Sequence, residues 1–369
     1  MIVERELAGI TLPFASGTFI AAYLPAQHSI TPLLFLLAAS AGAVALIHPK
    51  HKRLSNNVLT FTIVTTLACC GLFSGLSQNH LSASSPTSDD ALSGYASEFG
   101  SSLTDLINDL PFEDKQSNAV VSALITGNRQ ALSVETEATF RNSGASHILA
   151  LSGLHLGIIY GILKAVFALA GNRRRTKITK SILIIALCGF YTLATGANDS
   201  IVRAFLFILL GETASLTGRF QSIGSILMAA LLIQLLITPE SAKNAGFQLS
   251  YAAMAGIAYI YPWFKGMWTQ ETKGEDPVRR FLRWIWNSAS ISIACQITTG
   301  PIAYLYFGTF PQYFLLTNLI ALPIVGILIP IAVLTIMLEA CGISSTVLIQ
   351  ITESLVNVLC DSLSIISSL

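Results

Sequence analysis

The stretch "SHILALSGLHLGIIYG", residues 146–161, has the apolar content of a membrane helix but carries His147, Ser152 and His155. A strongly polar side chain in hydrocarbon costs several kcal/mol unless it is paired or reached by water. The three residues are therefore candidates either for a polar path through the membrane or for bonds between helices.

The composition around this stretch is that of a membrane protein. Of the 369 residues, 53% are hydrophobic and only 11% are charged, which is about half the charged fraction of a soluble domain. The apolar residues form blocks of roughly 17–25 residues, the length that crosses a bilayer as an α-helix. The blocks do not alternate with polar residues, which argues against a β-barrel. The sequence predicts an all-α, polytopic helical membrane protein.

The apolar blocks predict about ten or eleven transmembrane helices. They lie near residues 8–24, 30–48, 57–77, 147–170, 179–196, 199–217, 220–238, 245–264, 284–307, 312–339 and 344–368. The first block lacks the basic lead-in of a signal peptide, so it is expected to be a span that is not cleaved. Broken or re-entrant helices are expected near 298–341, where helix-breaking residues are frequent. These residues are Gly300, Pro301, Pro311, Pro323, Gly326 and Pro330.

The basic residues predict which side of the membrane each loop faces. With the N-terminus in the cytoplasm, 14 of the 21 Lys and Arg residues fall in loops on the inner side. These loops surround residues 50–53, 173–180, 219 and 265–283, whereas "PAQHS", "GAND" and "PESAKN" on the other side hold one basic residue in total. An excess of Lys and Arg marks cytoplasmic loops. A multi-pass protein of the bacterial cytoplasmic membrane with its N-terminus inside is therefore expected.

This topology divides the chain into three regions. Residues 1–77 hold three spans, residues 78–146 lie outside the cytoplasm, and residues 147–369 form the main membrane region. The outer segment has nine acidic and three basic residues, opens with a Ser-rich linker, and contains an amphipathic pattern from Leu92 to Leu110. We expect an amphipathic helix there, followed by short helices at 116–126 and 131–142.

Other polar residues within the predicted spans have two interpretations each. Arg203 and Glu212 share one span, and either pair with each other or line a path. Lys164 either belongs to that path or extends its ammonium toward the basic loop after it. Glu339, Glu353 and Asp361 are expected at span ends, and most of the buried amides are expected to join helices. The amides are Gln234, Gln248, Gln296, Asn318 and Asn357.

The histidines predict neither a metal site nor a catalytic serine. His147 and His155 lie about 80° apart around a helix axis, two turns along it, and no third ligand is nearby. An intramembrane serine hydrolase built on Ser152 needs a base on another span, and no histidine follows His155. Lys164 is the one other candidate base, and its distance along the helix disfavours it. No cofactor and no enzymatic activity are expected.

Five motifs resemble those of the ComEC family of competence proteins, in the family's order. "SGASHILALSGLHLGII" resembles the family signature that opens a membrane helix, and "ALITGNRQALSVETEATFRNSG" resembles the segment before it. "GANDSIVRAFLF" resembles the motif that carries Ser200 and Arg203. "NAGFQLSYAAMAGIAYIYP" resembles the helix that carries Gln248 and Ser250. "CQITTGPIAYLYFGTFPQYFLLTNLIALPI" resembles the late segment that carries Gln296 and Asn318.

The resemblance implies a membrane channel that takes up single-stranded DNA during natural transformation. It implies a channel-lining or motif role for His147, Ser152, His155, Ser200, Arg203, Gln248, Ser250, Gln296 and Asn318. A single-strand path combines cations with aromatic surfaces, for which the candidates are Tyr160, Tyr251, Tyr304 and Phe307. The alternative is a polytopic transporter of another solute or of a lipid on the same fold.

The chain departs from the larger family members in two ways. It has 69 residues where those members insert an OB-fold domain, and it ends without their metallo-β-lactamase-like domain. No nuclease activity is therefore expected, and a separate nuclease or DNA-binding protein is an expected partner. The sequence also has no nucleotide-binding loop, so a cytoplasmic helicase or motor is expected to supply the pulling force. Whether the chain forms a homo-oligomer stays open.

Overall fold

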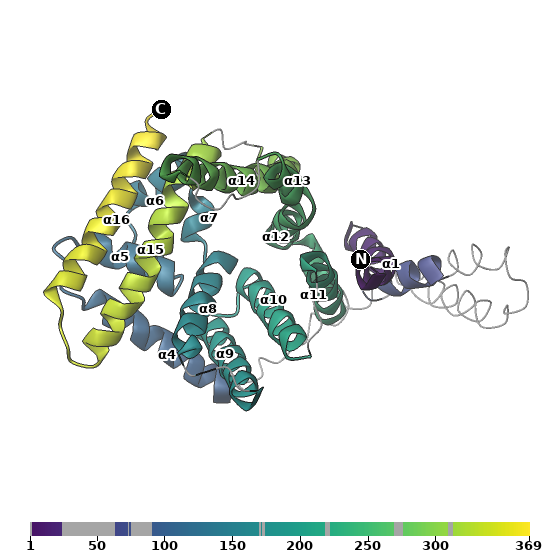
Figure 1. The fold of residues 1–369 in the computed structure, drawn as a ribbon, viewed down its shortest axis with the longest axis horizontal. Coiled ribbons are helices and arrows are strands. Elements are labelled where there is room, and N and C mark those ends of the chain that lie inside the picture. Colours follow the sequence, from purple (N-terminus) through teal and green to yellow (C-terminus); the bar gives the residue numbers. More distant parts are fainter. Residues whose placement is uncertain are drawn as a thin grey trace, which may run out of the picture.

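The structure is a computed structural model that describes residues 2–23, 63–72, 74, 91–169, 171, 174–217, 222–268, 276–308 and 313–369. The predicted span 30–48, the basic loop at 50–53 and the Ser-rich linker lie outside the described residues. Every regular element within the described ranges is helical, as the sequence predicts (Figure 1). The elements are α1 (Ile2–Tyr23), α4 (Ala91–Asn108), α5 (Lys115–Ile125), α6 (Val134–Asn142), α7 (Ser146–Leu149), α8 (Gly153–Ala168), α9 (Arg174–Ala194), α10 (Asp199–Leu216), α11 (Ile223–Ile237), η1 (Pro239–Lys243), α12 (Ala245–Ala255), η2 (Gly256–Ile260), α13 (Tyr261–Gly266), α14 (Pro277–Phe307), α15 (Phe314–Ala340) and α16 (Thr346–Ser367).

Most helices begin and end within a few residues of the predicted apolar blocks. Three of them are long and apolar enough to cross a membrane, namely Thr176–Ala194 within α9, Phe314–Ala340 and Thr346–Ser367. Shorter apolar helices occupy Ile63–Leu72, Gly153–Ala168 and Ile223–Ile237. The chain is therefore a helical membrane protein.

Pro301, Pro323 and Pro330 do not break the helices, so the prediction of helix breaks is wrong at these three residues, while Pro311 lies outside the described residues. Helix α14 passes through Pro301, and α15 passes through Pro323 and Pro330. A proline removes one backbone hydrogen bond, which a membrane helix tolerates where neighbouring helices support it. Here α14 packs on α12 and α15 packs on α16. The two helices are separated instead after Gly308, whose φ of 65° ends α14 in a left-handed conformation.

A helix break does occur at 150–152, within residues 147–170, for which the sequence predicts one continuous span. Helix α7 has only four residues and ends at Leu149, and α8 begins at Gly153. Between them Ala150 and Ser152 adopt extended backbone conformations. A second irregularity follows α12, where Gly256–Ile260 form a π-helix before Tyr261-Pro262.

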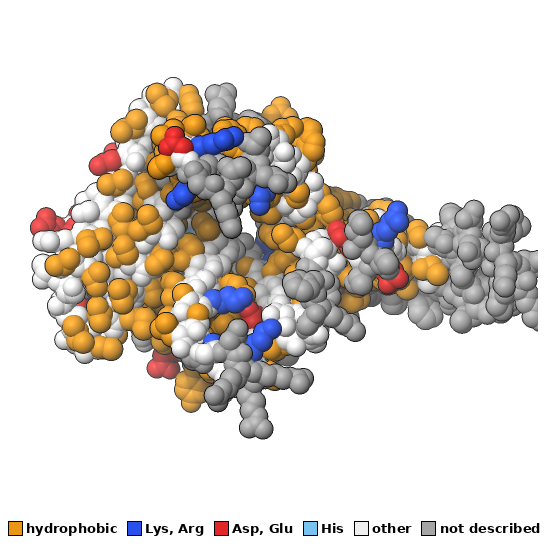
Figure 2. Space-filling view, viewed as in Figure 1, with side chains coloured by type: hydrophobic (Ala, Val, Ile, Leu, Met, Phe, Trp, Pro, Cys, Tyr) orange, Lys and Arg blue, Asp and Glu red, His pale blue; other side chains and the backbone are white. Residues whose placement is uncertain are grey.

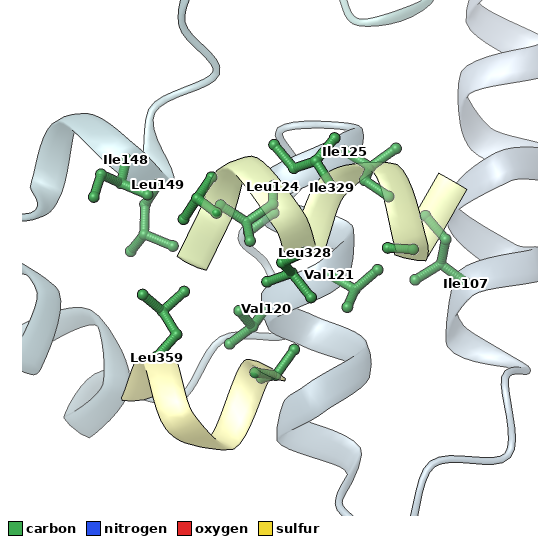
Figure 3. Packing of buried hydrophobic residues seen from close by; sticks show 14 of the residues in the cluster. Ile107, Val120, Val121, Leu124, Ile125, Ile148, Leu149, Leu328, Ile329 and Leu359 are labelled. Atoms are coloured by element: carbon green, nitrogen blue, oxygen red, sulfur yellow. The ribbon is translucent and has the colours of Figure 1, made fainter. Parts of the chain in front are cut away.

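Helix α5 lies at the centre of the largest hydrophobic core. Its nine residues from Ser117 to Ile125 are all buried, and it packs against α4, α7, α15 and α16. Figure 3 shows side chains from these helices converging around Val120, Val121 and Leu124. A helix buried on every side is typical of the middle of a large bundle.

Both ends of the turn before α5 are held by buried polar side chains. The backbone N–H of Asp114 donates to the Glu353 carboxylate of α16 at 2.8 Å, while the Asp114 side chain accepts from Gln116 N–H. The Asn118 amide donates to the carbonyls of Ile107, at 2.7 Å, and Leu110, at 3.0 Å. Glu353 therefore caps the central helix, which explains a carboxylate on an otherwise apolar face.

The described part of the predicted outer segment forms the three helices expected from its periodicity. These helices are α4, α5 and α6. The core that contains α5 also includes residues of α15 and α16, so packing continues across the boundary predicted at residue 146. The location of 78–146 outside the cytoplasm stays a prediction.

Helix α1 is joined to Ile63–Leu72 by a close backbone contact. A Cβ atom at Gly17 would collide with the backbone of Ala68, and one at Gly71 would collide with the backbone of Phe14. Small residues let two membrane helices approach in this way. On its other side α1 packs on α11 (Figure 1).

Replacing Leu124 by alanine should destabilise the whole bundle. Leu124 is 1% exposed at the centre of the core, so the substitution leaves a cavity and should cost about 2–5 kcal/mol. The matched control is Leu305→Ala, because Leu305 is 83% exposed and should change stability by less than about 0.5 kcal/mol. Thermal unfolding of the detergent-solubilised chain compares them, and equal unfolding midpoints would contradict a central role for α5.

Candidate functional site

Five helices form a closed ring in the structure. Helix α8 contacts α10, α10 contacts α12, α12 contacts α14, α14 contacts α15, and α15 returns to α8. Figure 1 shows this arrangement, with α14 facing α8 and α10 across the middle. Figure 2 shows that the same face of the molecule is hollowed there, with Lys and Arg side chains on both sides of the hollow.

The residues predicted from the motifs are distributed over this ring, at least one on each helix. Helix α7 carries His147, α8 begins at Ser152 and carries His155, α10 carries Ser200 and Arg203, α12 carries Gln248 and Ser250, α14 carries Gln296, and α15 carries Asn318. Motifs that lie more than 150 positions apart in the sequence are thus brought to one assembly of helices. Their role as lining residues stays a prediction.

Ser152 and His155 form the N-terminal cap of α8. The Ser152 hydroxyl accepts from Leu154 N–H at 3.3 Å, and Nδ1 of His155 accepts from Ser152 N–H at 3.1 Å. This is a capping box in which the imidazole takes the place usually held by a Glu or Gln side chain. Because Nδ1 accepts, the neutral ring carries its proton on Nε2, which is buried without a partner among the described residues.

His147 and Asn318 lie next to each other between α7 and α15. His147 is exposed, and its Nδ1 lies 3.1 Å from the Gly144 carbonyl oxygen. Asn318 is buried and donates weakly to Ser292 of α14 at 3.5 Å, which leaves its Oδ1 without a partner in the described chain. This part of the ring therefore combines an exposed imidazole with a free amide acceptor.

Arg203 is buried in the contact between α10 and α12. One guanidinium nitrogen, Nη2, donates to the Gly246 carbonyl oxygen at 2.9 Å. The guanidinium carbon lies 5.7 Å from the ring centre of Phe247 and 6.0 Å from that of Tyr251. Such cation–π contacts contribute about 2 kcal/mol when water is excluded. The side chain is 2% exposed, so it joins two ring helices rather than lying on an accessible surface.

The pairing of Arg203 with Glu212, one of the two interpretations of these residues, is absent. Glu212 lies nine positions after Arg203, on the opposite side of α10. Its carboxylate accepts from Tyr160 and Ser181, each at 2.6 Å, and forms an ion pair with Lys164 at 3.3 Å. Glu212 thus joins α8, α9 and α10. Lys164 is half exposed, which agrees with an ammonium that extends from the helix.

Sequence reasoning missed the bonds that connect the motif around Ser200 and Arg203 with the motif around Gln248 and Ser250. Asn244 caps α12 through Gly246 N–H and also donates to Asp199 at the start of α10, at 2.7 Å. Gln248 donates to the Tyr23 hydroxyl at 3.1 Å, and this hydroxyl lies 3.0 Å from that of Tyr306 on α14. The Asn residues that open "NDS" and "NAGFQLS" are a cap signal that could have placed the two helix starts, but the partner of each cap depends on the fold.

The remaining predicted residues are less constrained. Ser200 and Ser250 are half buried. Gln296 lines an open pocket of about 470 Å³ whose other walls are apolar, and its Nε2 is buried without a partner within the described ranges. Of the aromatic candidates, Tyr160 and Tyr251 donate hydrogen bonds to Glu212 and Gln234. Tyr304 and Phe307 are about 60% exposed.

Five of the nine buried side-chain polar atoms that lack a hydrogen bond in the described residues belong to predicted site residues. Within the described ranges, His155, Arg203, Gln296 and Asn318 each bury at least one nitrogen or oxygen that makes no hydrogen bond. A buried polar atom without a partner costs about 1–3 kcal/mol, and water or a ligand usually supplies the missing bond. No three His, Cys, Asp or Glu side chains of the described residues lie close enough to share a metal ion.

His155 accepts a hydrogen bond at Nδ1 and has a free Nε2, so two substitutions that treat these atoms differently should have different effects. His155→Ala removes the acceptor for Ser152 N–H and should lower stability by about 1 kcal/mol. His155→Asn places an amide oxygen where Nδ1 lies and should retain most of this stability, although it removes Nε2. Thermal unfolding in detergent measures both. If the Asn variant is as unstable as the Ala variant, His155 does not stabilise the start of α8 through Nδ1.

Comparison with known proteins agrees with the arrangement of the motifs. The family model described as "Competence protein" matches residues 124–369, which include the whole ring. ComE operon protein 3 of Bacillus subtilis is 27% identical over 208 residues, which cover 56% of this chain and 24% of that protein. The uncharacterized protein YcaI of Escherichia coli is 25% identical over 216 residues, which cover 56% of this chain and 27% of YcaI.

The matched region spans only about a quarter of the length of these two relatives. No solved structure matches the chain. The family model nevertheless covers about two thirds of the sequence and confirms the resemblance seen in the motifs. The chain belongs to the ComEC-type competence protein family.

Proposed function

We propose that this chain is the membrane channel through which single-stranded DNA passes into the cytoplasm during natural transformation. The hollow bounded by α8, α10, α12, α14 and α15 is the proposed path. The observation that carries the proposal is the placement of family motifs on every helix of one closed ring, four of which also carry an unsatisfied polar atom of a motif residue. Family membership supports a role in competence, and the proposal adds the cargo and the route.

The chemistry of a DNA strand fits the groups around the ring. A strand carries one negative charge for each phosphate, so it needs polar or cationic surroundings inside a membrane. His147 offers an exposed imidazole, while His155, Gln296 and Asn318 offer unsatisfied hydrogen-bonding atoms. Tyr304 and Phe307 are exposed and are suited to stack on bases. In this proposal Arg203 is a positioning residue that holds α10 to α12.

The proposal assigns no catalytic step to this chain. A cytoplasmic helicase or motor draws the strand inward, and a separate nuclease or DNA-binding protein prepares it outside. Basic side chains lie beside the hollow (Figure 2), and they would attract an anionic strand as it leaves the path on this face.

A transporter of an apolar solute or lipid is the second candidate. The pocket beside Gln296 favours it, because Ile293, Ile297, Pro301 and Phe314 form apolar walls. The two candidates differ in cargo and share the fold, so a direct measurement of DNA import separates them.

Import of labelled DNA in a strain that lacks this gene tests the channel. DNA bound outside the cell should stay normal, while DNA in the cytoplasm should fall to background and return with the wild-type chain. His147→Ala should lower import about tenfold, as expected for one lost hydrogen bond of roughly 1.4 kcal/mol along the path. The control is Asn142→Ala, an exposed polar residue of α6, with the amount of each protein measured in membranes. Normal import in the deletion strain would refute DNA as the cargo.

The location in the cytoplasmic membrane, with several passes and an inner N-terminus, is part of the proposal. Its support is the bias of basic residues toward alternate loops. In a cysteine-free chain, cysteines at Lys177 and Glu240 lie on loops predicted to face opposite sides. A membrane-impermeant maleimide should label Glu240→Cys in intact cells lacking an outer barrier, and Lys177→Cys only after the membrane is opened. Labelling of both from one side would contradict the topology.

A further inference from the structure

All four tryptophans of the chain lie within 24 residues of one another. They are Trp263 on α13, Trp268 shortly after its end, and Trp284 and Trp286 in the first turns of α14. We call residues 261–268 and 276–287 the α13–α14 elbow. Tryptophan is enriched where a membrane protein crosses the boundary between hydrocarbon and headgroups. Such a concentration at one bend indicates a contact with that boundary.

Two of the tryptophans hold the elbow together and two point outward. Trp286 donates from Nε1 to the Phe264 carbonyl oxygen at 3.1 Å, and its ring centre lies 6.1 Å from that of Trp268. Trp263 and Trp284 are 65% and 45% exposed, and Trp284 stacks on Phe281 with ring centres 6.1 Å apart. The inner pair fixes the bend, and the outer pair is available to a partner.

The first turns of α14 have an apolar face and a basic face. At about 100° per residue, Val278, Phe281 and Leu282 share one face, and all three are exposed. Arg279, Arg280 and Arg283 fall on the other face. Within the described part of the elbow, Lys265 adds a fourth basic residue and Asp276 is the one acidic residue. An exposed apolar face beside a basic face is typical of helices that lie in the surface of an anionic membrane.

We propose that the α13–α14 elbow binds anionic phospholipid of the cytoplasmic leaflet. The apolar face and the outer tryptophans enter the boundary between acyl chains and headgroups, and the basic face binds lipid phosphates. Nucleic acid shares the phosphate chemistry, but it would leave Val278, Phe281 and Leu282 exposed to water. Lipid covers both faces at once. This inference rests on the topology proposed above and is independent of the proposed cargo.

Lipid contact can be measured from the chain's own fluorescence, because every tryptophan belongs to the elbow. The full chain is reconstituted in phosphatidylcholine vesicles that contain either brominated phosphatidylglycerol or brominated phosphatidylcholine at the same mole fraction. The brominated anionic lipid should quench emission with an apparent affinity about thirtyfold higher, because two cationic side chains near a charged surface contribute about 1 kcal/mol each. Equal quenching by the two lipids would overturn the proposal.

Paired variants assign the preference to these residues. Lys265→Gln with Arg280→Gln should weaken the preference for the anionic lipid strongly, while Lys115→Gln with Arg129→Gln removes two exposed charges elsewhere and should retain it. The conservative pair Lys265→Arg with Arg280→Lys should also retain it, which separates charge from folding. Trp263→Phe with Trp284→Phe should remove most of the quenching. A preference that the first pair leaves unchanged would contradict the assignment.

The same vesicles distinguish lipid from nucleic acid. A single-stranded oligonucleotide added on the elbow's side should leave quenching by the anionic lipid unchanged. If the oligonucleotide relieves the quenching, the basic face binds the strand instead of the headgroups, and the lipid proposal fails.

Discussion

The burial of α5 on all sides is the constraint on which the rest of the bundle depends. A helix surrounded by other helices has no water for its first free N–H groups, so other side chains must bind them. Glu353 does this from α16 for the Asp114 N–H, and Asn118 binds the carbonyls at the end of α4. Residues 91–125 are thereby joined to the last two helices of the chain. Because α15 packs on both α5 and α16, this connection holds α15 in its place in the ring.

The stretch at 146–161 forms two helices, α7 and α8, with a break between them. Three residues with extended backbone at their ends interrupt an apolar segment that could otherwise have formed one helix. A new helix start needs a cap, and Ser152 and His155 supply it. The same break leaves His147 exposed beside Asn318. The polar residues that looked costly in hydrocarbon therefore differ in what they contact, and their role in a polar path stays a prediction. Some hold helices, and some keep unsatisfied atoms within the ring.

The ring and the α13–α14 elbow are parts of one helix pair. Helix α14 begins in the elbow with a basic, aromatic surface and continues into the ring with Gln296. Its partner α12 reaches the elbow through a π-helix, where Gly256 allows the backbone of α14 to approach at Ala294. π-Helical turns occur frequently at functional sites. A contact of the elbow with lipid would thus fix the position of one wall of the proposed path.

The helical membrane class, most helix ends and the family follow from the amino-acid sequence alone, because apolar blocks of bilayer length and local motifs are properties of neighbouring residues. It also located the helix-forming segments around α4, α5 and α6 from their periodicity. It was wrong about Pro301, Pro323 and Pro330, because packing by neighbouring helices decides whether a proline ends a helix. The partner of Glu212, which is Lys164 rather than Arg203, and the meeting of four motifs in one ring are visible only in the folded chain. Those outcomes depend on which helices meet, and side-chain partners across helices leave no signal in the spacing along the chain.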